Sequence, residues 1–185
     1  MCDARSCVIL IAAMPWLSGG VFAQEPDGTA PLHVSFVDDT ARIERNGQMA
    51  VAEVGHILAF GDRLRTEAGR AEVRWGDGTV LHLDVYSTVE VLNDGALRLF
   101  AGRLILYVTD AAGTAGYRIE TPAASVETSS ASTVQISILL EPDVRTELVV
   151  TRGRAWLIAD RGAAAGERWP VDRLDSRPRD ECRRC

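Results

Sequence analysis

The sequence has no lysine, only three histidines and no long helical pattern with caps. All 20 basic residues are arginine, and 26 acidic residues give the 185-residue chain a net charge of −6 and a pI near 5.1. No segment is predominantly basic, so nucleic acid is a poor partner, and an acidic chain is repelled by anionic membrane surfaces. Hydrophobic residues make up 46% of the chain, which is enough to build the core of one domain.

Cysteines are also few. Cys2 and Cys7 lie in an N-terminal leader, and the remaining pair, Cys182 and Cys185, forms a Cys-x-x-Cys at the end of the chain. This spacing permits a redox or metal pair, but a redox motif needs a helix N-terminus and a zinc site needs two further ligands. Neither context is present, which favours a tail whose thiols form a local disulfide or have no role.

The residue patterns of catalytic and metal sites are missing. His33, His56 and His82 are far apart and form no His-x-x-x-His pair, so we expect no metal and no cofactor. No glycine-rich loop opens a helix, as a phosphate site requires.

Candidate catalytic side chains have simpler interpretations. Ser129, Ser130 and Ser132 lie in a polar strand without a Gly-x-Ser-x-Gly elbow, which indicates a solvated face. Asp38 and Asp39 could serve acid–base chemistry across a cleft, but adjacent aspartates before a threonine are more typical of a turn. We therefore expect no enzymatic activity.

The N-terminus is typical of an export signal. Residues 7–22 are mostly apolar, are too short for a comfortable membrane span and contain Pro15. Val21-Phe22-Ala23 supplies the small residues of a cleavage site. We predict a signal peptide over 1–23, a polar linker over 24–32, and a periplasmic or otherwise exported protein with no membrane span after cleavage. The alternatives are an uncleaved anchor or a misplaced start codon.

Short strand-and-turn phrases fill the rest of the chain. In 71–75 apolar and polar residues alternate, and Asn46-Gly47 and Asp77-Gly78 are typical hairpin turns. The most apolar stretch after the leader, 102–108, predicts a central strand. We predict an all-β domain over 33–158, built as a solenoid-like or wrapped antiparallel β-sheet. A poorly ordered polar tail is expected over 159–185, with a short strand at 167–171.

One phrase recurs within the chain. Leu97, Gly102, Arg103 and Leu106 correspond to Leu148, Gly153, Arg154 and Leu157, each 51 positions later. Both phrases are a strand, a Gly-Arg turn and a second strand. The similarity favours a repeated supersecondary unit, although any two β-hairpins resemble each other.

Aromatic residues are the candidate binding groups, because exposed rings on a β face stack on sugars or anchor a protein partner. Tyr107 lies in the apolar central strand, and Trp156 alternates with Ala155 and Leu157, which indicates core positions. Trp169 is the best candidate for an exposed binding aromatic. The other candidates are Trp75 and Tyr86.

The order of these phrases resembles the FecR-type periplasmic domain, known from regulators of iron–siderophore signalling. The resemblance covers roughly half of the chain, and it implies an all-β fold with a binding or signalling role rather than catalysis. Its signature positions, which the resemblance implies are structural, are Gly61, Asp62, Thr66, Asp77, Gly78, Gly102, Arg103, Thr121 and Pro122.

Two features depart from the family pattern. Ala131-Ser132 stands where the family usually has Gly-Thr before its next strand. Signalling members carry a cytoplasmic helical segment and one spanning helix ahead of this domain, and this sequence has neither. It therefore resembles a freestanding exported subgroup, and the Arg183-Arg184-Cys185 ending is what a truncated chain would show.

These observations leave three hypotheses. The first is a non-catalytic exported β-domain that binds an envelope protein in a sensing or regulatory role. The second is a structural or polysaccharide-binding component of the cell envelope, with a glycan as ligand. The third and weakest is a hydrolase, which would need a cleft with a carboxylate of raised pKa.

Overall fold

The computed structural model describes residues 31–111, 116–140, 143–159 and 168–172, and these form fifteen strands and no helix. The predicted all-β class is confirmed. The predicted signal peptide (1–23), most of the linker (24–32), and Cys182 and Cys185 lie outside the described residues. No described segment forms a helix of the length and hydrophobicity needed to cross a membrane.

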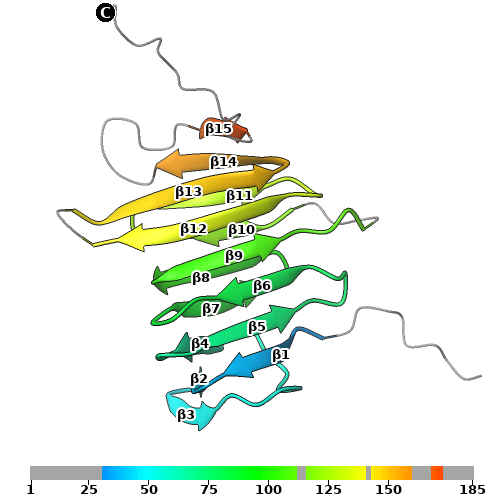
Figure 1. Cartoon of the computed structure of the whole chain (residues 1–185), viewed down its shortest axis with the longest axis vertical. Coiled ribbons are helices and arrows are strands. Elements are labelled where there is room, and N and C mark those ends of the chain that lie inside the picture. Colours follow the sequence, from blue (N-terminus) through cyan, green and yellow to red (C-terminus); the bar gives the residue numbers. More distant parts are fainter. Residues whose placement is uncertain (1–30, 112–115, 141–142, 160–167, 173–185) are drawn as a thin grey trace, which may run out of the picture.

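The strands form two sheets that face each other (Figure 1). All neighbours in the six-stranded sheet are antiparallel. In spatial order its strands are β1 (His33–Asp38), β5 (Arg70–Arg74), β6 (Val80–Leu83), β9 (Arg103–Tyr107), β12 (Thr133–Leu139) and β13 (Arg145–Arg152).

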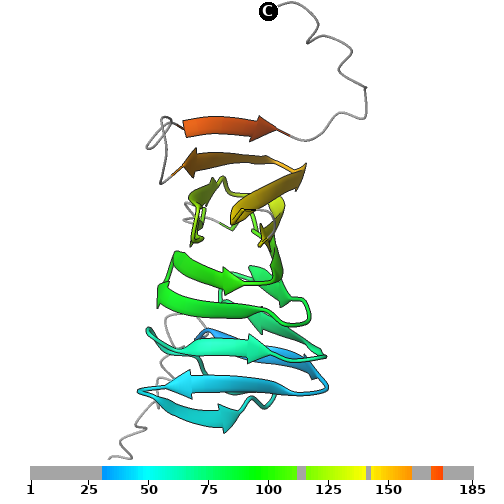
Figure 2. The same ribbon diagram turned by 90° about the vertical axis from the view of Figure 1, so that its left-hand side faces the viewer.

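The second sheet has nine strands. Its spatial order is β15 (Arg168–Asp172), β14 (Arg154–Ala159), β11 (Ala124–Thr128), β10 (Arg118–Glu120), β8 (Ala96–Ala101), β7 (Thr88–Asn93), β4 (Arg63–Thr66), β2 (Ala41–Arg45) and β3 (Gln48–Val51). Seen from two directions, the strands stack from β3 at one end of the molecule to β15 at the other (Figures 1 and 2).

Alternation of buried and more exposed residues along many of the strands builds the core between the sheets. Ala71, Val73 and Trp75 are buried and share one face, as the sequence predicts, whereas Arg74 is exposed on the other. The predicted central strand is β9, which lies between β6 and β12 and buries Leu104. Further fully buried side chains are Ile43, Leu64, Leu81, Leu83, Leu97, Leu99, Leu106, Ile119 and Ile136.

The internal similarity falls on two crossings between the sheets. Gly102 joins β8 to β9 and Gly153 joins β13 to β14, with φ of +83° and +75°. A Cβ on Gly102 would lie 2.3 Å from Ser87 Oγ, and one on Gly153 would lie 2.8 Å from Ser132 Cα. Both crossings thus require glycine for the same two reasons, a left-handed φ and a close backbone approach.

The structure has two sheets, and neither of them is closed or curled. The finer prediction of a solenoid-like or wrapped antiparallel sheet therefore stays a prediction. One pairing, β8 with β10, is parallel, because the chain leaves β8 for β9 in the other sheet before it returns as β10. The short strand expected at 167–171 corresponds to β15, which pairs with β14.

Candidate interaction surface

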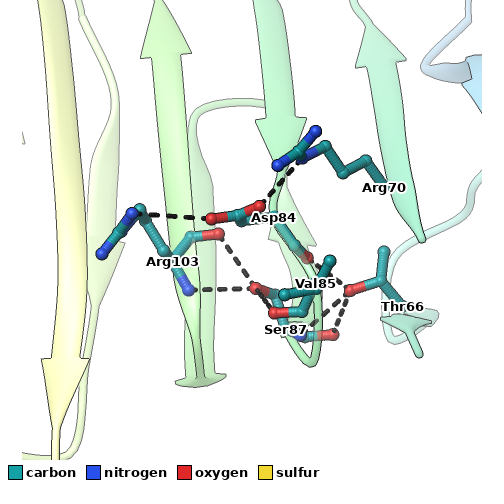
Figure 3. A network of polar contacts seen from close by, with 6 residues as sticks. All are labelled: Thr66, Arg70, Asp84, Val85, Ser87 and Arg103. Carbon is teal, nitrogen blue, oxygen red and sulfur yellow. Dashed lines mark hydrogen bonds and ion pairs between the residues drawn. The ribbon is translucent and has the colours of Figure 1, made fainter. Parts of the chain in front are cut away.

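A network of polar contacts joins both sheets at the turn between β6 and β7 (Figure 3). Asp84 accepts a hydrogen bond from Arg70 Nε at 2.9 Å and lies 3.6 Å from Arg103 Nη1. Ser87 Oγ accepts the Arg103 N–H at 2.9 Å, and Thr66 Oγ1 donates to the Asp84 carbonyl oxygen at 2.6 Å. The bond from Arg70 is the largest cause that holds the pKa of Asp84 below its usual range. The network fixes the turn, and two signature positions, Thr66 and Arg103, belong to it.

The Asp77-Gly78 turn is held from several sides. Asp77 Oδ1 accepts the Thr79 N–H at 2.7 Å, and Gly78 has a φ of +85°. The Tyr117 hydroxyl donates to Asp77 Oδ2 at 3.3 Å while its ring meets Trp75 edge-on, with centroids 5.1 Å apart. Burial raises the pKa of Tyr117 far above its usual value. The tyrosine therefore joins the turn to the core.

Asp62 is a buried carboxylate beside the Gly61 turn. It accepts Arg45 Nε at 2.8 Å, Arg45 Nη2 at 2.5 Å and the Ala59 N–H at 2.7 Å. Burial acts to raise the pKa of Asp62, but the bonds from Arg45 and Ala59 outweigh it, and the pKa lies below its usual value. Gly61 has a φ of +87°, and a Cβ at this position would meet no atom within 4 Å, so the turn needs glycine for its backbone conformation alone.

Thr121 and Pro122 form the turn between β10 and β11. Thr121 Oγ1 donates to the Ala124 carbonyl oxygen at 2.6 Å and accepts its N–H at 3.1 Å. Thr121 Oγ1 also lies 2.5 Å from Thr146 Oγ1 on the facing sheet. Pro122 is exposed and lies outside the strands. Across the signature positions, the contacts are those of residues that hold turns and crossings.

The side chains considered for catalysis lie in structural roles. Ser129, Ser130 and Ser132 lie between β11 and β12, so the polar strand predicted for them is wrong. Ser129 Oγ donates to the Arg154 carbonyl oxygen at 3.1 Å, and Ser132 is buried rather than solvated and donates to the Ser129 carbonyl oxygen at 2.7 Å. Asp39 has a φ of +62° in the turn after β1, as predicted, whereas Asp38 is the last residue of β1 rather than part of the turn. Within the described ranges no three His, Cys, Asp or Glu side chains gather as metal ligands.

The outer face of the six-stranded sheet has a shallow hollow of about 260 Å³. Arg70, His82 and Arg103 are among its lining residues. His82 Nε2 lies 3.3 Å from Glu72 Oε2, and the His82 ring meets Tyr107 edge-on. A hydrogen bond from the Ser35 hydroxyl is the largest cause that lowers the pKa of Glu72. Oppositely charged groups are already paired there.

The outer face of the nine-stranded sheet carries a row of alternating charges. The row runs directly across five neighbouring strands, β2, β4, β7, β8 and β10, through Glu44, Arg63, Glu90, Arg98 and Glu120. Arg63 Nε lies 3.2 Å from Glu90, and Arg98 Nη2 lies 2.7 Å from Glu120. Because each charge has a neighbour of opposite sign, the face is polar but locally neutral.

The aromatic candidates divide into core and surface positions. Trp75 belongs to the core. The Arg168 guanidinium lies 4.3 Å from the Trp156 ring centroid and pairs with Glu127 at 2.8 Å, so one face of that ring is covered. Trp169 is half-buried on β15 opposite Leu157, so a binding role for Trp169 stays a prediction. Tyr107 is 41% exposed, so the core position predicted for it is wrong, and Tyr86 is 69% exposed.

Large apolar side chains are exposed on β1, β3 and residues 52–61, which together form one end of the molecule. Six are at least half exposed, although residues of this kind are usually buried. Residues 53–58 bond along β1, which places this segment beside the edge of the six-stranded sheet. We call the following set the apolar end: Phe36, Met49, Val51, Val54, Ile57 and Phe60.

The apolar end was not apparent from the sequence. The sequence predicts only an all-β domain over 33–158, whereas the chain around Ile57 and Phe60 is largely irregular. Residues 52–60 lack the period-2 alternation of a half-buried strand, and this was the one sequence signal that the segment is irregular.

The comparison with protein families agrees with this architecture. The family described as FecR protein matches residues 62–156, just over half of the chain. No sequence among curated proteins matches. FecR proteins are envelope signalling and regulatory proteins without catalytic activity, and their domains are typically periplasmic. The match runs from β4 into β14 and includes eight of the nine signature positions, all except Gly61, and on it the chain belongs to the FecR family.

Proposed function

We propose that this protein is an exported, non-catalytic FecR domain that binds an envelope protein through its apolar end in a sensing or regulatory role. One observation carries the proposal. Ile57, Phe60 and Val54 are 55%, 62% and 67% exposed within one short segment. Clustered exposed apolar side chains at the surface of a folded protein mark interaction sites.

The two broad sheet faces support this choice by contrast. Their charges are largely paired within the chain, as in Arg98 with Glu120 and Arg70 with Asp84. A partner on either face would have to replace existing ion pairs and gain little apolar burial. At the apolar end, contact removes apolar surface from water, which drives association.

We also infer that the fold is solenoid-like, with strand groups that alternate between two sheets along one axis. The two equivalent crossings at Gly102 and Gly153 support this view. In such stacks each unit is covered only by its neighbours, so the ends need a cap or a partner. The apolar end is then the natural docking position.

The test is capture of partners from a crosslinked envelope fraction of the native cell. The bait is the wild-type chain, an Ile57→Asp/Phe60→Asp variant, or a matched Leu139→Asp/Leu140→Asp variant on exposed residues elsewhere. We expect the wild type and the Leu139/Leu140 variant to recover the same stoichiometric envelope protein and the Ile57/Phe60 variant to lose it. Equal recovery with all three would refute the apolar end as the site.

A second function, glycan binding, has one favouring observation. An open hollow of about 490 Å³ is lined mainly by polar groups, with Tyr117 and Trp156 at its walls. A sugar could stack on Trp156 only after Arg168 leaves the ring. Binding of cell-envelope polysaccharide by the wild type, abolished in Trp156→Ala, would support this function over the first.

A further inference from the structure

Two open sheets have four edges, and free edges present unpaired N–H and C=O groups that can recruit another strand. Three of the four are protected. Residues 53–58 cover β1, where the Val34 N–H bonds His56 O at 2.9 Å and the Gly55 N–H bonds Val34 O at 2.8 Å. The β13 edge carries Arg145, Glu147 and Arg152, and the β15 edge carries Arg168 and Pro170. Charges and proline discourage strand addition.

The fourth edge, β3, has none of these devices. Its residues Gln48, Met49, Ala50 and Val51 include no charge and no proline, and the strand pairs with β2 without a bulge. All four are exposed, and no described strand lies beyond β3 in the nine-stranded sheet. This edge is therefore open to an added strand.

The outward backbone groups of β3 follow from its ladder with β2. The Ala52 N–H bonds Ala41 O at 2.9 Å, so Ala52 directs its backbone groups toward β2. Residues of an antiparallel strand alternate in this respect, so Ala50 also faces β2 while Met49 and Val51 direct their N–H and C=O groups away from it. Two residues thus offer four backbone groups along the free edge.

The inner face of the nine-stranded sheet is also hollowed at this point. A hollow of about 360 Å³ is lined by Ile43, Arg45, Gln48, Ala50 and His56, among others. The six-stranded sheet ends at β1, whereas the nine-stranded sheet continues to β3 (Figure 1). Ala50, which is exposed, would gain burial from side chains of an added strand.

We propose that the occupant is a second copy of this chain, paired antiparallel along β3 about a two-fold axis at Ala50. In this register Ala50 lies opposite Ala50 of the second copy, and Met49 lies opposite Val51. Each Met49–Val51 pair then exchanges two backbone hydrogen bonds, and the two nine-stranded sheets become continuous. An isologous contact of this kind closes at a dimer.

The charges that flank β3 favour this register, although they act across three strand spacings of about 4.8 Å each. On the outer face Met49 lies next to Glu44, and Val51 lies next to Arg42. Pairing Met49 with Val51 aligns the Glu44 row of one copy with the Arg42 row of the other. The alternative register, Met49 opposite Met49, would align Glu44 with Glu44 at the same separation, where like charges repel weakly. The smallest side chain also stands on the axis, where the two copies approach most closely.

Cysteine crosslinking tests the contact and its register together. In the full chain the native Cys2, Cys7, Cys182 and Cys185 are replaced by serine, and Ala50→Cys, Met49→Cys and Gln48→Cys are compared under mild oxidation. Directly opposite residues of a non-hydrogen-bonded pair lie about 4.5 Å apart between Cα atoms, within disulfide range.

We expect the Ala50→Cys chain to form a covalent dimer much faster than the other two. Gln48 is the matched control, because it lies on the same face of the same strand but four positions from its symmetry mate. Equal rates at all three positions, preference for Met49→Cys, or no crosslinking would each overturn the proposal.

Association without crosslinks is measured by sedimentation equilibrium of the full chain under reducing conditions. We expect Met49→Lys/Val51→Lys to weaken dimerisation by about tenfold or more, because each pair would oppose two lysines. Leu139→Lys/Leu140→Lys should leave it unchanged. A wild-type chain that stays monomeric at millimolar concentration would refute the dimer. Partner capture depends on Ile57 and Phe60, so either proposal can fail alone.

Discussion

The apolar end and the middle of the molecule, around β8 and β9, both place glycines with positive φ between strands. The two regions put different constraints on these glycines. Gly47, between β2 and β3, has a φ of +76° and no atom within 4 Å of a Cβ position. Gly102, between β8 and β9, has a φ of +83° and lies against the backbone and side chain of Ser87. The first glycine supplies only a backbone conformation, whereas the second also supplies space between two sheets.

The two regions differ in the same way in their apolar residues. In the middle, Leu99 and Leu104 are fully buried between the sheets. At the apolar end, residues of similar size such as Ile57 and Phe60 are more than half exposed. Stability therefore resides in the middle, and the end is free to vary in what it contacts.

The largest expected effect comes from adding one methyl group at each glycine. Gly102→Ala should lower the free energy of unfolding by about 3–4 kcal/mol, because it combines backbone strain with a clash against Ser87. Gly47→Ala should cost only about 1 kcal/mol, the strain of the left-handed conformation. Urea denaturation measures both. Equal losses would show that space at Gly102 is unimportant.

The turns of both regions were predictable from sequence. Asn46-Gly47 is a strong hairpin signal, and both residues have positive φ, as the two-residue turn requires. Asp77-Gly78 likewise separates β5 from β6. Alternation in 71–75 identified the buried face correctly. These signals come from residues close together in the sequence, so they can be recognised without knowing which strands pair.

The assignment of strands to sheets was not predictable. Leu97 and Leu148 have the same local sequence context, yet β8 belongs to the nine-stranded sheet and β13 to the six-stranded sheet. The sequence of a short strand does not specify which strand pairs with it. The parallel pairing of β8 with β10 arises because the intervening β9 lies in the other sheet. The hydroxyl network of Ser87 was missed for the same reason, since its partners are distant in sequence.

The second effect concerns a strongly buried charge beside the apolar end. Asp62→Asn should lower the free energy of unfolding by about 2 kcal/mol. The substitution weakens the two hydrogen bonds from Arg45 and removes the negative charge that the Arg45 guanidinium pairs with. Urea denaturation at neutral pH measures the loss. A matched change at Asp38, an exposed carboxylate on β1, should be nearly neutral. A neutral result at Asp62 would mean that the end is held by its apolar contacts alone.

The same carboxylate gives a pH dependence with a defined sign. The pKa of Asp62 is lower in the folded protein than the unfolded value of about 3.9. Its stabilisation is therefore fully present above that value and is lost as the pH falls through the folded pKa. Between neutral pH and pH about 3, the wild type should lose more stability than Asp62→Asn. Parallel curves would contradict this assignment.

A smaller effect is expected from the hydroxyl network of the middle. Ser87→Ala removes the acceptor of the Arg103 N–H and should cost about 1–2 kcal/mol. Thr40→Val provides a comparison outside the middle, because the Thr40 hydroxyl makes a long, exposed bond of 3.3 Å to Asp39. In thermal unfolding, the melting temperature of Ser87→Ala should lie well below that of Thr40→Val. A reversed ranking would locate the stabilising network elsewhere.

The smallest effect separates exposed ion pairs in the two regions. Arg98 and Glu120 lie in the middle of the nine-stranded sheet, where Arg98 donates through Nε at 3.1 Å and Nη2 at 2.7 Å. Arg42 and Glu67 lie nearer the apolar end and share one bond of 2.9 Å. Double-mutant cycles with alanine should give about 0.5–1 kcal/mol for the first pair and less than about 0.5 kcal/mol for the second. Both couplings should shrink in high salt because the side chains are solvent-accessible. A larger coupling for Arg42–Glu67 would mean that the apolar end is held as firmly as the middle, and the contrast between the two regions would then rest on packing alone.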